Sequence, residues 1–132
     1  MLTILILEDD DRLCQHWRSL LELKGYLVIV QSDTDGAIQS LNESKIDLVI
    51  SDMIIRDQTN SIRSKGGLSL LAHIAMNLEP PAPKVLTVTG SNPELFLDKH
   101  AKAMQSDLCL RKPIADKELI TAVETLLADD DE

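Results

Sequence analysis

The sequence predicts an α/β protein with a parallel β-sheet, and two observations support this fold class. Short apolar runs rich in isoleucine, valine and leucine alternate with segments whose apolar residues recur every three or four positions. The apolar runs lack the polar alternation of a half-exposed strand, so both faces of the sheet should be covered. Five strand and helix units predict right-handed crossovers, and 132 residues suit a single domain.

The strands and the first two helices follow from local patterns. Strands are expected at residues 2–7, 27–30, 47–51, 84–88 and 108–110. Apolar residues from Leu13 to Leu21 recur at helical spacing, and Gly25 is placed to end that helix. Ser32 and Asp35 resemble a capping box at the start of a second, short helix.

Three more helices are expected, the first of them after a long polar loop. The third helix carries the apolar residues Leu68, Leu71, Ile74, Ala75 and Leu78, and the prolines that follow should end it. A fourth helix with a thin apolar stripe begins near Ser91 or Asn92. The last helix has a strong stripe, formed by Leu119, Ile120, Val123, Leu126 and Leu127.

The composition narrows the range of partners. With 22 acidic and 13 basic side chains the formal charge is −9, which argues against direct binding to nucleic acid or to an anionic membrane. Residues 129–132 are all acidic and are expected to form a solvated tail. No apolar run approaches the roughly 20 residues of a membrane-spanning helix. Cys14 and Cys109 lack zinc-ligand spacing, so we expect reduced thiols in a cytoplasmic protein.

Four apolar runs end at residues able to handle a phosphoryl group, namely Glu8 with Asp9, Asp52, Thr89 and Lys112. The carboxyl ends of parallel strands gather at one edge of a sheet, where ligands bind in α/β proteins. Asp52 can attack phosphorus to form an acyl phosphate, and the carboxylates of Glu8 and Asp9 favour Mg²⁺. Lys112 can bring positive charge to phosphoryl oxygens, and the hydroxyl of Thr89 can donate to one of them.

Each of these residues has a simpler interpretation when it is taken alone. Asp52 could be a solvated loop aspartate, Lys112 a surface lysine, and Thr89 part of ordinary strand composition. Asp10 and Asp11 are expected to start the first helix, where negative charge complements the helix dipole. The combination of strand ends, rather than any single residue, therefore carries the functional prediction.

These residues make the chain resemble the receiver domain of two-component response regulators. The likeness covers residues 1–128 and rests on four segments, 4–10, 47–52, 85–90 and 111–113. It implies a flavodoxin-like (CheY-like) fold, with a five-stranded parallel sheet of order 2-1-3-4-5 and helices on both faces. Residues 129–132 would then form an acidic tail after the domain.

The resemblance also implies the chemistry of the site. Asp52 is the phosphoacceptor, and Mg²⁺ is the cofactor. Asp9 and Asp52 bind the metal directly, whereas Glu8 acts mainly through water. The main-chain carbonyl of Ile54 supplies the third protein ligand.

Partners follow from the resemblance as well. A histidine kinase or a histidine phosphotransfer protein supplies the phosphoryl group, which Thr89 and Lys112 contact on Asp52. An unidentified downstream protein or output domain then responds through changed protein contacts. The domain assists its own phosphorylation and dephosphorylation and is not an enzyme acting on a free metabolite. A cis peptide bond is implied between Lys112 and Pro113.

Two features depart from the family pattern. Cys109 lies three residues before Lys112, where receivers usually have the aromatic residue that follows the threonine during switching. The loop at 53–65 is expanded, and a role in kinase choice or phosphoryl lifetime competes with a simple tolerated insertion. Ile54 and Ser91 offer no general base for water, which predicts a long-lived phosphoaspartate.

Other function classes compete with this interpretation. The strongest rival is a phosphorylation-independent, receiver-like interaction module, since Cys109 replaces the switch aromatic. A magnesium-dependent aspartyl-phosphate phosphatase is more remote, because Ile54 occupies the place of the second acid that such enzymes need. A dinucleotide-binding domain would require a glycine-rich turn where this chain has the acidic residues 8–11.

Overall fold

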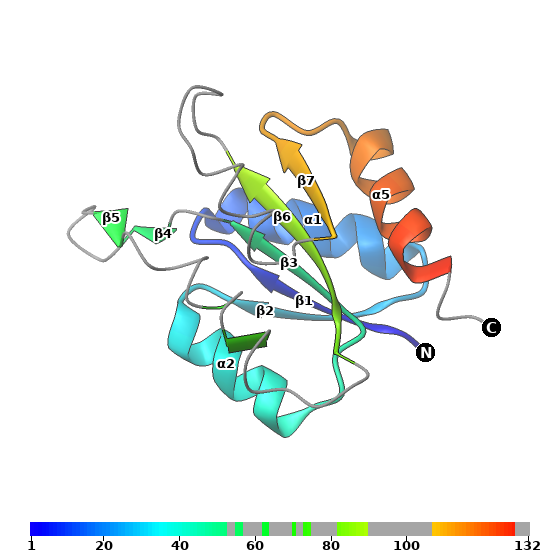
Figure 1. The fold of residues 1–132 in the computed structure, drawn as a ribbon. Coiled ribbons are helices and arrows are strands. Elements are labelled where there is room, and N and C mark those ends of the chain that lie inside the picture. The colour runs from blue at the N-terminus through cyan, green and yellow to red at the C-terminus, as the bar shows by residue number, and fades with distance from the viewer. Residues whose placement is uncertain are drawn as a thin grey trace.

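A five-stranded parallel sheet forms the centre of the molecule (Figure 1). The computed structural model describes residues 1–52, 70, 73–74, 82–88 and 107–128, with the backbone alone described at 55–56, 62–63 and 89. The strands are β1 (Thr3–Leu7), β2 (Leu27–Gln31), β3 (Leu48–Asp52), β6 (Lys84–Thr89) and β7 (Leu108–Arg111). They pair in parallel in the order β2-β1-β3-β6-β7. This confirms the predicted order 2-1-3-4-5, since β6 and β7 are the fourth and fifth strands of this sheet along the chain.

Helices cover both faces of the sheet, as predicted. The described helices are α1 (Asp11–Leu23), α2 (Thr34–Glu43) and α5 (Asp116–Ala128). Figure 1 shows α1 and α5 on one side of the strands and α2 on the other. None of these helices combines the length and apolar character that crossing a bilayer requires.

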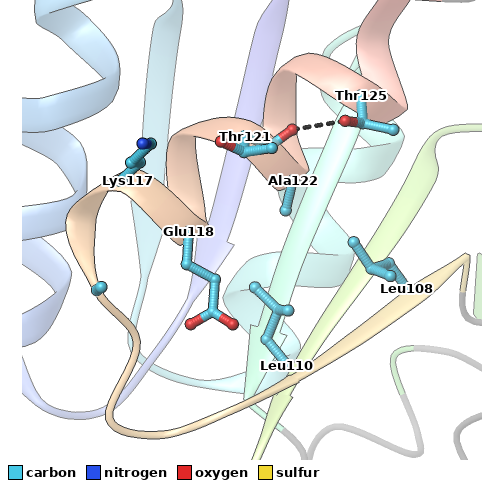
Figure 2. Close-up of a pocket in the computed structure, with 8 residues that line it drawn as sticks. Leu108, Leu110, Lys117, Glu118, Thr121, Ala122 and Thr125 are labelled. Carbon is cyan, nitrogen blue, oxygen red and sulfur yellow. Dashed lines mark hydrogen bonds between the residues drawn. The ribbon is translucent and has the colours of Figure 1, made fainter.

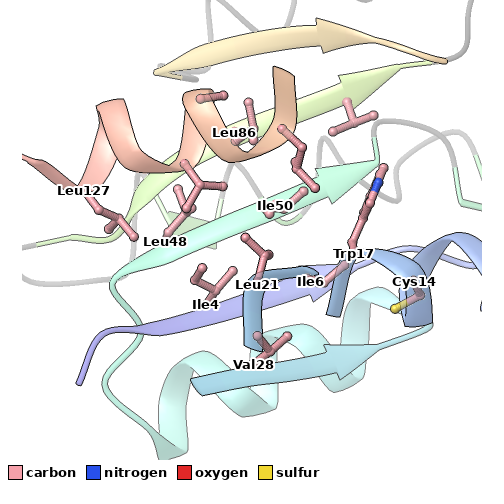
Figure 3. Close-up of a cluster of buried hydrophobic side chains, with 14 residues drawn as sticks. Ile4, Ile6, Cys14, Trp17, Leu21, Val28, Leu48, Ile50, Leu86 and Leu127 are labelled. Atoms are coloured by element: carbon pink, nitrogen blue, oxygen red, sulfur yellow. The ribbon is translucent and has the colours of Figure 1, made fainter. Parts of the chain in front are cut away.

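Two buried clusters reflect the alternation of side chains along each strand. Ile4, Ile6 and Leu86 pack against α1 and α5 in the larger cluster (Figure 3). Leu5 and its neighbours on the opposite face pack against α2 in the smaller cluster. Fully burying one such aliphatic side chain contributes about 1.5–3 kcal/mol. The continuous apolar strands of the sequence therefore supply both halves of the core.

The starts and ends of α1 and α2 explain where the connecting loops turn. The side chain of Asp10 caps α1 by accepting from the Leu13 N–H at 3.2 Å, and Gly25 follows that helix with a φ of 95°. The cap of α2 corrects the sequence prediction, because Asp33 rather than Ser32 accepts from the Gly36 N–H, at 2.7 Å. The backbone of Asp33 is still extended, and from this position its carboxylate reaches the amide of Gly36 in the first turn of the helix.

The region between β3 and β6 is described only in part. Leu70 and Ile74 are helical and buried in the smaller cluster, which agrees with a third helix, although Leu70 was not among the predicted core residues. The predicted fourth helix, Leu71 and the acidic tail lie outside the described residues. The expanded loop contains two short antiparallel strands, β4 (Ile55–Arg56) and β5 (Ile62–Arg63), where an irregular polar loop was expected. A β-branched isoleucine in each strand favours this pairing.

Two aspartates fix the strands at the edge opposite the carboxyl ends. Asp47 accepts the Thr3 N–H at 2.8 Å, and its own N–H donates to the Thr3 carbonyl at 2.9 Å. Asp107 accepts the Val85 N–H at 2.7 Å. Each carboxylate thus satisfies an amide at the start of a neighbouring strand and holds the register of the pair.

We expect Asp47→Ala to lower the free energy of unfolding by about 1–2 kcal/mol, because the Thr3 amide loses its acceptor. Asp47→Asn retains an acceptor oxygen at the same place and should recover most of that loss. Urea denaturation of the three proteins measures the difference. Equal stability of the native protein and Asp47→Ala would contradict the role assigned to this carboxylate.

Candidate functional site

The carboxyl ends of β1, β3 and β7 bring three predicted site residues into contact. The Lys112 ammonium lies 3.0 Å and 3.2 Å from the two carboxylate oxygens of Glu8. The same nitrogen lies 3.0 Å from Oδ2 of Asp52. These residues are 104 and 60 positions from Lys112 along the chain, so the parallel topology alone assembles them. We call Glu8, Asp9, Asp52 and Lys112 the acidic pocket.

Burial makes the charges of the acidic pocket interdependent. Glu8 is 1% exposed and Asp52 is 6% exposed, so neither carboxylate is well hydrated. Charged groups removed from water require partners of opposite charge. Among the described residues, Lys112 supplies that positive charge to both carboxylates.

The pocket also fits a divalent cation. Glu8, Asp9 and Asp52 each offer a carboxylate oxygen, and these oxygens lie within 4.8 Å of one another. A compact set of carboxylate oxygens suits a hard cation such as Mg²⁺, which takes a few protein ligands and keeps several waters. The predicted carbonyl ligand at Ile54 lies outside the described residues.

The remaining predicted residues are only partly placed. Thr89 ends β6 beside Arg111 of β7, but its side chain lies outside the described part of the chain. The peptide bond between Lys112 and Pro113 is cis, as the resemblance implied. Asp10 and Asp11 begin α1 rather than join the carboxylate cluster, as predicted.

Burial raises the pKa of the Glu8 carboxyl from its ordinary 4.5 to about 8. The adjacent Asp52 carboxylate adds to this rise, whereas Lys112 opposes it. Partial burial alone would lower the pKa of Lys112, but the attraction of Asp52 and Glu8 outweighs that effect and raises it. Lys112 therefore stays charged, and additional positive charge in the pocket would favour loss of the Glu8 proton.

Neither Cys14 nor Cys109 forms a disulfide bond in the structure. Cys14 is buried, and burial raises its pKa to about 11, which keeps the thiol protonated. Cys109 is half-buried on β7 and lies opposite Thr87 of β6. The sequence prediction of reduced thiols agrees with these positions.

A separate apolar groove of about 510 Å³ lies between β7 and α5. Leu108 and Leu110 line it from the strand, and Ala122 and Thr125 line it from the helix (Figure 2). It contains none of the residues of the acidic pocket. The residues to which the sequence assigns phosphoryl chemistry therefore lie apart from this groove.

Without a divalent cation, stability should fall as pH rises from about 4.5 to about 8. Native Glu8 retains a proton over this range that the unfolded chain has lost, so the slope is negative, up to about 1.4 kcal/mol per pH unit. Urea denaturation in a metal chelator across this range measures the slope. Glu8→Gln should flatten it, whereas Glu22→Gln, at an exposed site on α1, should leave it unchanged. A slope that survives Glu8→Gln would contradict the assignment.

Comparison with known proteins agrees with this geometry. The family model described as "Response regulator receiver domain" matches residues 4–124. The transcriptional regulatory protein CpxR of Escherichia coli K12 is 31% identical over 124 residues, which cover 94% of this chain and 48% of CpxR. A CpxR homolog of Haemophilus influenzae is 29% identical over 127 residues, covering 96% and 51% of the two chains. The chain thus spans about half the length of these curated relatives.

Solved structures show the same fold. A two-component response regulator from Clostridium difficile superposes with a TM-score of 0.84 at 23% identity, and the match covers 100% of both chains. The signal receiver domain of an HD domain-containing protein from Pseudomonas fluorescens Pf-5 gives a TM-score of 0.81 at 27% identity, covering 97% of this chain and 95% of that one. The chain belongs to the response regulator receiver domain family of two-component systems.

Proposed function

We propose that Asp52 accepts a phosphoryl group from a histidine kinase or a histidine phosphotransfer protein, with Mg²⁺ as cofactor. The observation that carries this proposal is the acidic pocket, in which a buried aspartate at a strand end lies 3.0 Å from the Lys112 ammonium and beside two more carboxylates. The domain extends over residues 1–128, and residues 129–132 form an acidic tail.

The transfer step places the nucleophile on Asp52. A carboxylate oxygen of Asp52 attacks the phosphorus of the donor phosphohistidine, and the bond between phosphorus and the imidazole nitrogen breaks. The imidazole keeps the bonding electrons and regains a proton, and the product on this chain is an aspartyl phosphate. Reaction between anions depends mainly on position and on compensating charge.

Each neighbour of Asp52 then has a defined task. After transfer, Lys112 contacts the phosphoryl oxygens and neutralises part of their charge. Before transfer, it shares its positive charge between Glu8 and Asp52. Asp9 and Asp52 would hold the metal directly, Glu8 would act through water, and the Ile54 carbonyl would supply the third protein ligand. When bound, Mg²⁺ supplies charge that offsets the repulsion between phosphoryl oxygens and carboxylates.

The Thr89 hydroxyl donates to a phosphoryl oxygen, and this contact starts the change in protein binding. The signal reaches a downstream protein or an output domain in the cytoplasm through altered protein contacts, without direct nucleic-acid binding by the acidic domain. The domain contributes groups to its own modification and does not turn over a free metabolite. The small side chain of Cys109 cannot move between inward and outward positions as an aromatic ring does. The change that begins at Thr89 therefore reaches the protein surface through residues other than Cys109.

Incubation with Mg²⁺ and acetyl phosphate, followed by intact mass measurement, should show one added phosphoryl group on the native chain. Asp52→Asn should abolish the adduct, because an amide is a poor nucleophile. Asp11→Asn makes the same chemical change in the exposed first turn of α1 and should leave the adduct in place. A metal chelator should suppress the adduct in both the native chain and Asp11→Asn.

The opposite results are equally informative. An adduct that survives Asp52→Asn would contradict the assignment of the acceptor. Failure of the folded native chain to form any adduct would favour a phosphorylation-independent interaction module.

A further inference from the structure

The strand β2 ends beside the acidic pocket at Gln31, a residue with no role in the chemistry described so far. Gln31 pairs with Leu7, the last residue of β1. Its main-chain carbonyl then accepts the N–H of Glu8 at 3.2 Å. This hydrogen bond is one step beyond the β1–β2 pairing, at the point where the chain leaves the sheet. The main chain of a pocket carboxylate is thus held by Gln31.

The side chain of Gln31 is itself fixed to α2. Its Nε2 donates to the hydroxyl of Ser40 at 3.0 Å, in a partly buried setting. Its Oε1 lies over Gly36 in the first turn of α2, so close that a Cβ built on Gly36 would be 2.5 Å from that oxygen. The Gln31 amide is therefore bound to Ser40 and lies in space that a side chain at residue 36 would occupy.

Gly36 is otherwise unexpected in this helix. Glycine is a poor helix former, and this glycine shows no left-handed backbone that would require it. The space above its Cα is used by the Gln31 amide. The glycine and the glutamine thus form an interlocking pair.

The carboxylate of Glu8 depends on how its main chain is held. Its side chain is buried and faces Lys112, and its Oε1 also accepts the Asp10 N–H at 3.4 Å. A shift of the Gln31 carbonyl would move the Glu8 backbone relative to Asp52 and Lys112, which are held by β3 and the loop after β7. The contact of Gln31 with α2 thus lies one residue and one hydrogen bond away from the main chain of Glu8.

We propose that Gln31 is a positioning residue of the acidic pocket, locked on α2 by Ser40 and Gly36 and holding the main chain of Glu8. The proposal concerns the main chain of Glu8 in the metal-free protein, and its consequence for Mg²⁺ binding rests on the proposed function. Residues that orient metal ligands typically change metal affinity by about 10- to 100-fold when they are altered.

Three variants test the interlock, namely Gln31→Ala, Gly36→Ala and the double variant. Gly36→Ala should displace the Gln31 amide from Ser40 and leaves every residue of the acidic pocket unchanged. Gln39→Ala is the matched control, because Gln39 lies on the exposed face of the same helix and bonds Glu43. In the metal-free protein, amide hydrogen exchange followed by NMR reports on the Glu8 N–H directly. Calorimetric titration with Mg²⁺ reports on the pocket.

Gln31→Ala should speed exchange of the Glu8 amide about tenfold relative to the amides within β1, and weaken Mg²⁺ binding by about tenfold. Gly36→Ala should shift both in the same direction. In the Gln31→Ala background Gly36→Ala should cause no further change in either measurement, because the amide that it would displace is absent. Gln39→Ala should change neither exchange nor affinity.

Unchanged exchange of the Glu8 amide in Gln31→Ala would overturn the proposal, whatever happens to Mg²⁺ binding. If the native protein bound no Mg²⁺, the proposed function would fail, and the exchange measurement would still decide the role of Gln31. Loss of stability alone, with Glu8 exchange accelerated no more than that of other β1 amides, would reduce Gln31 to an ordinary structural residue and also overturn the proposal.

Discussion

The contact of one ammonium group with two buried carboxylates is the interaction on which the site depends. When Glu8 is ionised, it and Asp52 repel each other in a space that excludes most water, and Lys112 offsets this repulsion from 3.0 Å. This balance of charges makes the acidic pocket sensitive to added ligands, because the contacts of the Lys112 ammonium can be exchanged. A phosphoryl group competes for Lys112, and a divalent cation competes for the carboxylates.

The fold makes this contact possible because one set of residues stabilises the sheet and another set forms the site. Aliphatic side chains on both faces of the sheet fix the strands, and Asp47 and Asp107 satisfy strand amides at the opposite edge. The carboxyl ends of the strands can then carry charged residues that contribute little packing. Burial of Glu8 at this edge removes its carboxyl group from water, which is unfavourable. The stability of the surrounding sheet and helices offsets this unfavourable free energy.

The strands, three described helices and pocket residues were predictable because each has a local signal. Apolar runs mark the strands, and the polar residue after each run marks its end at the site. Details that arise from contacts between distant segments were not predictable. The hydrogen bond from Lys112 to Glu8 spans 104 positions, and the overlap of Gln31 with Gly36 depends on how α2 packs. The Asp33 cap required the actual backbone, since Ser32 had equally suitable chemistry.

The most direct measurement of the central claim is the position of the phosphoryl group in the chain. Borohydride reduces an aspartyl phosphate to homoserine, which marks the modified residue permanently for peptide mapping. After treatment with Mg²⁺ and a phosphohistidine donor, the account predicts homoserine at position 52 and at no other carboxylate. Homoserine at another aspartate, or its complete absence despite a competent donor, would contradict the account.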